Sequence, residues 1–240
     1  MDEKRTLHGR RQGRPLRKNR RELVERLLPG LSVDLESLPA NPADLFPTPV
    51  RDVWLEVGFG SGEHLFHQAV RNPEIGIIGC EPFLNGVAKL LSEIENFEKP
   101  VRNVRLLTDD ARPLLDALPD GSIGRAFVLF PDPWPKNRHH RRRFIAPPQL
   151  DGLARVMRPG AELRLATDHI GYLRWMLFHT LAHPGFRWLA RGPEDWRRRP
   201  EDWPSTRYEE KALQKGIGST YLRFERRHSR PNSGGIAALK

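Results

Sequence analysis

The chain has 240 residues and a mass of 27.6 kDa, which is enough for one well-packed α/β domain and too little for two full ones. Its single cysteine, Cys80, excludes an internal disulfide and a cysteine-rich zinc site, and no apolar run is long enough for a membrane helix or a secretory signal. We therefore expect a cytoplasmic location without a membrane partner, and the formal net charge of +10 favours a polyanionic partner such as nucleic acid.

Most of the positive charge lies in two segments. Residues 1–26 hold ten Lys and Arg against four Asp and Glu, and residues 136–143 add five more cations. We predict that residues 1–30 form a basic, flexible arm, with a short helix starting over residues 21–28. The arm alone is equally typical of an RNA-binding segment and of a solvated tail. We expect residues 31–228 to form the folded domain and residues 229–240 to form a disordered tail.

After a proline-rich connector, strand and helix patterns alternate along the chain. The expected strands are 53–57, 75–80, 104–107, 126–130 and 162–166. The expected helices are 62–70, 84–97, 150–157 and 170–181. This alternation predicts an α/β fold with a mostly parallel, doubly wound sheet, whose ligands bind at the carboxyl ends of the strands. The last β-rich segments, 186–190 and 220–226, are expected to form an antiparallel edge without a crossover helix.

A glycine-rich loop follows the first expected strand. Its glycines, Gly58, Gly60 and Gly62, allow a ligand to approach the backbone closely. The dinucleotide fingerprint would require glycine at position 63, where this chain has Glu63, and Glu56 and Glu63 would repel a pyrophosphate. The same carboxylates suit the sulfonium and ammonium groups of S-adenosylmethionine. A tight structural turn is the alternative interpretation of the loop.

Acidic residues also end the next two expected strands. Glu81 lies about twenty residues beyond the loop, where a carboxylate can accept from both ribose hydroxyls. Asp109 and Asp110 end the third strand, where they can accept from an adenine amino group. The loop, Glu81 and Asp110 on three successive strand ends together predict a cofactor site.

The segment Pro131-Asp132-Pro133-Trp134 ends the fourth expected strand. The two prolines stiffen the turn and hold Asp132 at the strand terminus, and the cations that follow suit a phosphate backbone. Trp134 offers a face for base stacking, although packing against the sheet explains it equally well. For Asp132 the structural alternative is a helix cap, and for the cationic run it is a solvated face.

His64 and His67 lie one helical turn apart, but no carboxylate or cysteine completes a metal site with them. We therefore expect no metal. Cys80 is expected to be a packed, inert thiol.

Taken together, these residues resemble the bacterial type of the tRNA (guanine-N7-)-methyltransferase family. The resemblance covers about residues 50–227 and is most specific in the Pro131–Trp134 turn with Lys136, His139, Arg142 and Arg143 after it. Further matches are Ala166-Thr167-Asp168 and Thr206-Arg207-Tyr208-Glu209. The resemblance implies a Rossmann-like methyltransferase fold, S-adenosylmethionine as methyl donor, and guanosine 46 in the variable loop of tRNA as target. We expect no obligatory protein partner, and a monomer or a homodimer.

The resemblance also implies roles for individual residues. Those implied to contact S-adenosylmethionine are Glu56, Glu81, Asp110 and Asp132. Those implied to contact the substrate are Lys136, Asp168, Thr206, Arg207, Tyr208 and Glu209. Those implied to touch RNA are Arg138, His139, His140, Arg141, Arg142 and Arg143. The chain departs from the family pattern at His169-Ile170, where an aromatic or acidic residue is expected, and in its proline-rich connector.

Guanine N7 carries an exposed lone pair, so its methylation needs no general base and should depend mainly on positioning. Carboxylates that accept from the N1–H and the exocyclic amine of guanine would discriminate against adenine. We predict this role for Asp132, which is also the expected catalytic residue, and for Asp168, with Glu209 as a further candidate. The segment Thr206–Glu209 either orders over the substrate or is a surface connector. The alternative functions are methylation of another RNA base and RNA binding without catalysis on the same fold.

Overall fold

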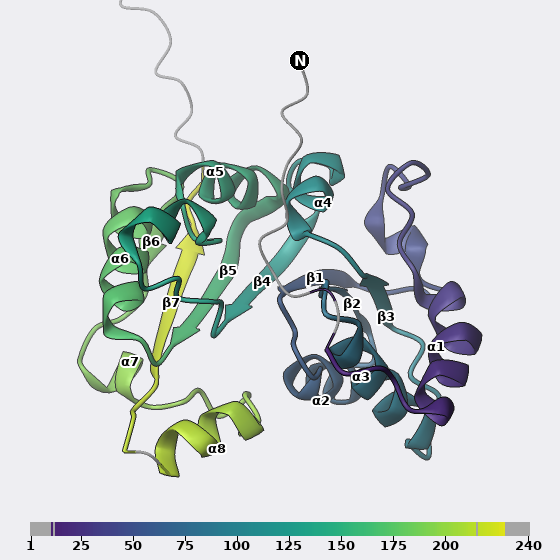
Figure 1. Ribbon diagram of the computed structural model, residues 1–240. Helices are drawn as coiled ribbons and strands as arrows, with labels where there is room; N and C mark the ends of the chain where they lie inside the picture. The colour runs from purple at the N-terminus through teal and green to yellow at the C-terminus, as the bar shows by residue number, and fades with distance from the viewer. Residues whose placement is uncertain (1–10, 12, 215, 229–240) are drawn as a thin grey trace, which may run out of the picture.

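The computed structural model describes residues 11, 13–214 and 216–228; the other residues, including the predicted tail and the start of the predicted arm, lie outside this part. A seven-stranded sheet runs through the described residues in the order β3-β2-β1-β4-β5-β7-β6 (Figure 1). Its strands are β1 (Asp52–Val57), β2 (Ile75–Cys80), β3 (Val104–Leu107), β4 (Ile123–Leu129), β5 (Met157–Thr167), β6 (Phe186–Trp188) and β7 (Thr220–Arg226). Strands β1 to β5 pair in parallel, and β7 is antiparallel to both β5 and β6. The predicted mostly parallel α/β fold with an antiparallel edge is confirmed.

Helices cover both faces of the sheet. They are α1 (Lys18–Leu31), α2 (Glu63–Arg71), α3 (Leu84–Asn96), α4 (Ala111–Ala117), α5 (Pro147–Val156), α6 (Ile170–Ala182), α7 (Glu194–Arg197) and α8 (Arg207–Gln214), with 3-10 turns η1 (Pro42–Leu45) and η2 (Asn137–Arg142). Because strand side chains alternate, Leu55 of β1 packs in the core beneath α4, α5 and α6, whereas its neighbour Trp54 packs in the core beneath α2 and α3. The central strands are therefore apolar on both faces, as a parallel sheet requires.

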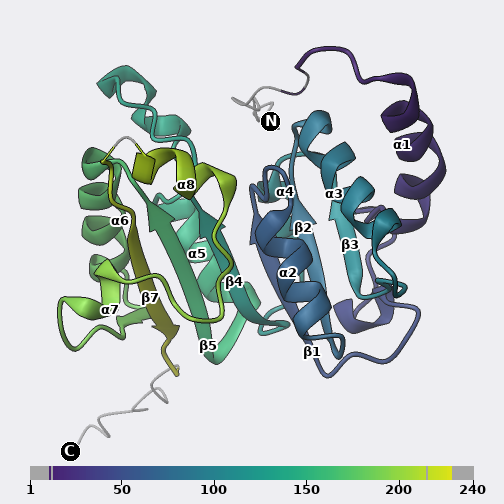
Figure 2. The ribbon, with the colours of Figure 1, turned by 90° about the horizontal axis from the view of Figure 1, so that it is seen from below.

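The short helix predicted within the basic N-terminal segment, over residues 21–28, is present and is longer than expected. Residues Lys18–Leu31 form one helix, α1, which lies along α3 at the outer side of β3 (Figure 2). Leucines at helical spacing, including Leu23 and Leu27, pack against the α2–α3 core, while the cationic side chains stay exposed. Burial of this apolar stripe stabilises the helix, although the charged residues on its other face favour a disordered segment.

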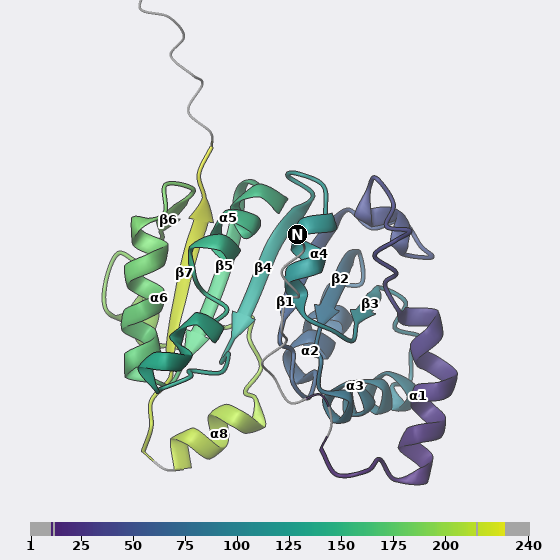
Figure 3. The ribbon, with the colours of Figure 1, turned by 45° about the horizontal axis from the view of Figure 1, so that its top comes forward.

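Helix α4 was not anticipated, because it is short and contains Pro113. The proline is tolerated since it lies within the first turn, where the helix leaves its N–H groups unpaired. Two further helices, α7 and α8, lie between β6 and β7, where no helix was expected. Helix α8 lies beyond the carboxyl ends of β4 and β5 (Figure 3), which places it at the ligand-binding edge of the sheet.

Candidate functional site

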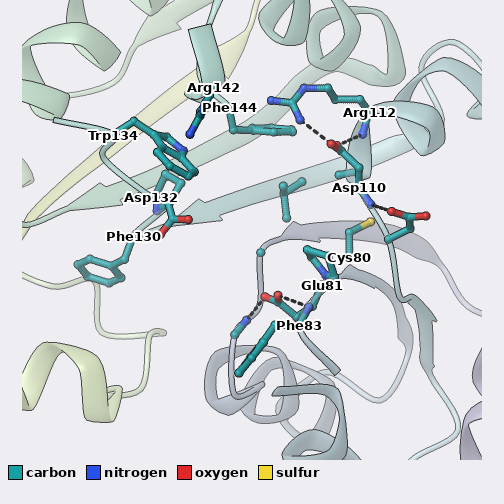
Figure 4. Close-up of a pocket in the computed structure, with 17 residues that line it drawn as sticks. Cys80, Glu81, Phe83, Asp110, Arg112, Phe130, Asp132, Trp134, Arg142 and Phe144 are labelled. Atoms are coloured by element: carbon teal, nitrogen blue, oxygen red, sulfur yellow. Dashed lines mark hydrogen bonds and ion pairs between the residues drawn. The ribbon is translucent and has the colours of Figure 1, made fainter. Parts of the chain in front are cut away.

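A cavity of about 470 Å³ opens at the carboxyl edge of the sheet, where β1 and β4 are neighbours and the strand order reverses. Its walls come from the loops that follow four parallel strands, so it gathers residues from distant parts of the sequence. These include Gly58 and Gly60 after β1, Glu81 and Phe83 after β2, Asp109 and Asp110 after β3, and Asp132 and Trp134 after β4. Figure 4 shows Asp132 and Trp134 across the cavity from Glu81 and Phe83. The structure therefore brings the strand-end residues Glu81, Asp110 and Asp132 together around one cavity, as the sequence predicts.

Glu81 holds the glycine loop in place. Its Oε2 accepts a hydrogen bond of 2.7 Å from the backbone N–H of Gly60, and its Oε1 accepts one of 2.9 Å from the N–H of Phe83. Gly58 and Gly60 both have positive φ, at 72° and 57°, which favours glycine at these positions. Burial raises the pKa of Glu81, and the nearby charges of Asp132 and Glu56 raise it further, although the two backbone donors oppose the shift.

The glycine loop is also pressed against helix α3. A Cβ atom added at Gly86 would lie 2.0 Å from the carbonyl oxygen of Gly60, and backbone atoms cannot rotate away as a side chain can. The close contact with helix α3 therefore fixes the position of the glycine loop in the cavity wall.

Replacing Gly86 by alanine should displace the loop at Gly60 and weaken binding of S-adenosylmethionine, the cofactor that the family resemblance implies, at least about tenfold. The matched control is Gly152→Ala in helix α5, where an added Cβ meets nothing closer than 3.6 Å. Calorimetric titration of both variants measures the difference. Equal cofactor affinity in the two variants would contradict the steric argument.

Asp110 and Asp109 line the cavity and each has a cationic partner. Asp110 caps helix α4 through the N–H of Arg112 at 2.9 Å and pairs with its guanidinium at 2.6 Å. Asp109 pairs with Arg11 of the N-terminal segment at 3.2 Å. A carboxylate has about four acceptor positions, so Asp110 retains capacity for a further donor. Cys80 also borders the cavity, and burial raises the pKa of its thiol, which keeps it protonated.

The turn after β4 is held in an uncommon backbone conformation. Phe130 and Trp134, each followed by proline, have positive φ of 50° and 42°, a region that costs non-glycine residues about 1–3 kcal/mol. The Phe130 N–H donates to the Ala166 carbonyl at 2.8 Å, which ties the turn to β5. Asp132 lies between the two constrained residues and is exposed to the cavity. The predicted rigid placement of Asp132 at a strand terminus is thus explained by its neighbours.

The cationic segment after this turn divides into two groups. Lys136, Arg138 and Arg141 are exposed, as an RNA contact requires, and His139 and His140 are half-buried. Arg142 lines the cavity, with its guanidinium 5.0 Å from the ring centroid of Trp134. That contact covers one face of the tryptophan. Among the cations implied to touch RNA, Arg138 and Arg141 are therefore the exposed ones, and Lys136, implied to contact the substrate, is exposed beside them.

Arg143 is the exception, because the structure does not bring it to the RNA-facing surface. It is buried, its Nε donates to the carbonyl of Pro133 at 2.8 Å, and its guanidinium lies 5.0 Å from Tyr172 and 4.9 Å from Trp175. Its predicted RNA contact is corrected to a structural role: it fastens the Pro131–Trp134 turn to helix α6. The faces of two aromatic rings, rather than RNA phosphates, stabilise the buried positive charge.

Replacing Arg143 by alanine should lower the free energy of unfolding by about 3 kcal/mol, because it leaves a cavity and an unpaired carbonyl. Arg141→Ala, at the exposed neighbour, should change it by less than about 0.5 kcal/mol. Urea denaturation followed by tryptophan fluorescence measures both values. Similar free energies of unfolding for the two variants would show that the buried contacts of Arg143 do not stabilise the fold.

Glu56 is placed differently from the other implied cofactor residues. It is buried and is absent from the cavity lining, and its Oε2 lies 2.7 Å from Nδ1 of His64. The side chain belongs to β1 and points into the core beneath α2 rather than toward the cavity. His64 was expected to be structural or exposed, and it is buried.

The implied substrate residues are not all in the cavity. Asp168 follows β5 at the same sheet edge as Asp132 and is half-buried. Thr206 and Glu209 form a capping box: the Thr206 N–H donates to Glu209 Oε2 at 3.0 Å, and the Glu209 N–H donates to Thr206 Oγ1 at 3.2 Å. Glu209 Oε1 accepts from the Tyr221 hydroxyl at 2.6 Å, so both carboxylate oxygens are engaged in the fold. The side chains of Arg207 and Tyr208 lie outside the described part.

Sequence reasoning missed the apolar and cationic walls of the cavity, which Phe83, Phe144 and Arg112 provide. Phe83 lies two residues beyond the strand-end Glu81, and this offset is the one signal that pointed to it. Phe144 comes from a segment after η2, and no pattern in the sequence indicates that it turns back toward Asp110.

The charge of the cavity suits a cationic, amphipathic ligand. Glu81, Asp109, Asp110 and Asp132 outnumber the two guanidiniums, and aromatic rings supply the apolar surface. S-adenosylmethionine combines a sulfonium, an ammonium, a ribose and an adenine, and these residue types fit all four. Among the described residues, no group of three His, Cys, Asp or Glu side chains is arranged to hold a metal. Within the same residues, no helix is both long and apolar enough to cross a membrane.

Comparison with known proteins gives a consistent result. The family described as putative methyltransferase matches residues 50–222. The chain is 53% identical to the tRNA (guanine-N(7)-)-methyltransferase of Rhodospirillum rubrum, with 96% of this chain and 91% of the relative covered. It is 50% identical to the protein of the same name from Agrobacterium fabrum, with 91% and 94% covered.

Solved structures share the fold at lower identity. The 16S rRNA methyltransferase KamB aligns with a TM-score of 0.54 at 19% identity, over 75% of this chain and 89% of that one. The 16S rRNA (adenine(1408)-N(1))-methyltransferase from Catenulisporales acidiphilia aligns with a TM-score of 0.52 at 17% identity, over 82% and 95%. These likenesses establish a methyltransferase fold of the Rossmann-like type.

Proposed function

The chain belongs to the tRNA (guanine-N7-)-methyltransferase family, and from this premise we propose that it transfers a methyl group from S-adenosylmethionine to N7 of guanosine 46 in the variable loop of tRNA. The observation that carries the proposal is the acidic cavity at the carboxyl edge, with Asp132 facing Glu81 across it. The proposal includes a cytoplasmic location, where tRNA is available.

S-adenosylmethionine, when bound, supplies a methyl group on a positively charged sulfur. Glu81 and Asp110 would hold the ribose and adenine, because each presents carboxylate oxygens at a strand end that borders the cavity. Phe83 and Phe144 would cover the apolar surface of the adenine. The glycine loop would admit the methionine part close to the backbone at Gly58 and Gly60.

Guanine recognition falls to carboxylates at the ends of β4 and β5. Asp132 would accept from the N1–H and the exocyclic amine, with Asp168 beside it at the same edge. No residue would need to remove a proton, because the N7 lone pair is already exposed; with S-adenosylmethionine bound, formation of the N–C bond would break the S–C bond and leave the positive charge on the guanine ring. A nearby carboxylate stabilises that charge, and the rigid Pro131–Trp134 turn keeps it in place.

The exposed cations Lys136, Arg138 and Arg141 would bind tRNA phosphates next to the cavity. Lys136 directly precedes η2 and the two arginines lie on it, so all three follow the Asp132 turn, which connects phosphate binding with delivery of the base.

The test is methyl transfer from labelled S-adenosylmethionine to an unmodified tRNA transcript, followed by nucleoside analysis. The expected product is 7-methylguanosine, with no label transferred to a matched transcript that carries adenosine at position 46. A different methylated nucleoside would replace the target, and tight RNA binding without transfer would favour a non-catalytic RNA-binding protein.

A further inference from the structure

A buried pair of side chains joins the two ends of the glycine loop. Glu56 lies just before the loop and His64 just after it, and the carboxylate and the ring are joined at 2.7 Å. Both side chains are buried, so the pair is shielded from solvent. The loop between them includes Gly58 and Gly60, which line the cavity. The pair therefore fixes the spacing of the two ends of the cofactor loop.

The pair continues into Gln68, one helical turn further along α2. The Nε2 atom of Gln68 lies 3.3 Å from Nε2 of His64 and donates to the carbonyl oxygen of Asp202 at 2.6 Å. The bond directions are consistent: His64 donates from Nδ1 to Glu56, and the two hydrogens of the Gln68 amide go to the His64 ring and to Asp202. This buried chain joins the first strand to a residue 134 positions away from Gln68.

Asp202, at the far end of this series of hydrogen bonds, belongs to the segment that leads into α8. Trp203, next to Asp202, is buried with its ring edge-on to His64 at 5.7 Å and edge-on to Tyr221 at 5.5 Å. The Asp202 carboxylate accepts from buried Arg164 at 2.7 Å, which fastens the segment to β5. Tyr221 in turn holds the Glu209 side chain of the capping box.

This segment ends at the catalytic edge of the sheet. Thr220, which starts β7, pairs with Thr167, which ends β5 directly before Asp168. Helix α8 precedes β7, and Figure 3 shows it beyond the ends of β4 and β5. Residues 202–209, which we call the substrate segment, lead into α8 at this edge, and the buried link joins Asp202 and Trp203 at their start to helix α2 behind the glycine loop.

We propose that Gln68 and His64 are positioning residues that couple the cofactor loop to the substrate segment, so that cofactor and tRNA bind cooperatively. The proposal rests on the proposed function, because it concerns the two ligands of that reaction. A cofactor that settles the loop around Gly58 and Gly60 also settles the end of α2 that carries His64, and Gln68 transmits this to Asp202 and Trp203. Coupling of this kind is reciprocal: each ligand raises the affinity for the other by the same factor.

The experiment measures tRNA affinity with and without saturating S-adenosylhomocysteine, the unreactive product of the cofactor, in the full chain. The wild type should bind tRNA at least about fivefold more tightly when the product is present. Gln68→Met keeps the length of the side chain and removes both amide bonds, so this ratio should fall below about twofold. Trp203→Phe, which keeps a ring but shortens the contact with His64, should lower the ratio in the same direction.

Ile123→Val is the matched control, because Ile123 is fully buried at the opposite, amino end of β4. It should lower the thermal midpoint, as Gln68→Met does, and leave the ratio at the wild-type value. An unchanged ratio in both Gln68→Met and Trp203→Phe, or a ratio of one in the wild type, overturns the proposal while leaving methyl transfer intact. Failure of the wild type to bind tRNA or the product overturns the proposed function instead, and the coupling with it.

Discussion

Replacing Asp132 by alanine should lower kcat/KM for tRNA methylation about 1,000-fold, equivalent to about 4 kcal/mol, while tRNA affinity changes little. Two charge-assisted hydrogen bonds to the guanine would be lost together, and without them N7 is no longer held in line with the methyl group. The loss should be this large because Phe130 and Trp134 hold the turn in a constrained conformation, so its backbone cannot readily shift to restore the lost contacts. Single-turnover methylation and filter binding of tRNA measure the two quantities.

Asp120→Ala is the control for that substitution, since Asp120 is an exposed aspartate paired with Arg155 away from the cavity. It should leave both turnover and tRNA affinity at the wild-type values. An equal loss of turnover and of tRNA affinity in Asp132→Ala would instead assign Asp132 to RNA binding or to the fold.

Replacing Glu81 by glutamine should weaken binding of S-adenosylmethionine about 100-fold, equivalent to about 2.7 kcal/mol. The carboxylate accepts from the N–H groups of both Gly60 and Phe83, and an amide that accepts one of these bonds presents its own donor to the other. The glycine loop then loses its anchor and the cavity loses a negative charge. Glu93→Gln, on the exposed side of helix α3, is the matched control and should bind the cofactor normally.

The pH dependence of the same binding gives a second readout of Glu81. Burial raises the pKa of this carboxyl, so its protonation begins at a higher pH than for an ordinary glutamate. Because the ionised form accepts from the loop and the ligand, cofactor affinity of the wild type should fall as pH is lowered through that raised pKa. The glutamine variant should show a flatter profile over the same range, and parallel profiles would count against Glu81 as the titrating group.

Much of the architecture was predictable because strand and helix periodicity is local. Strands 75–80, 104–107 and 220–226 coincide with β2, β3 and β7 to the residue, since each is a compact apolar or alternating run with clear ends. The fourth strand begins at Ile123 rather than residue 126, and β5 begins at Met157. These extensions come from pairing between the two strands, which a single segment does not reveal.

The meeting of Glu81, Asp110 and Asp132 was also predictable. The carboxyl ends of parallel strands lie at one edge, so residues that end successive strands must face the same cavity. The burial of Glu56, Arg143 and Glu209 was not predictable in this way. Each is a charged residue in a motif with a functional resemblance, and only its partners distinguish a ligand contact from a structural one.

The sequence by itself determined the order of the strands, the acidic edge and the family, because these depend on residue types at local spacings and strand ends. The tertiary structure alone decided which charged residues of these motifs are held by the fold instead of facing a ligand. His64 comes to Glu56, two aromatic rings to Arg143, and Tyr221 to Glu209, and each charged side chain turns toward the partner that offsets its loss of water.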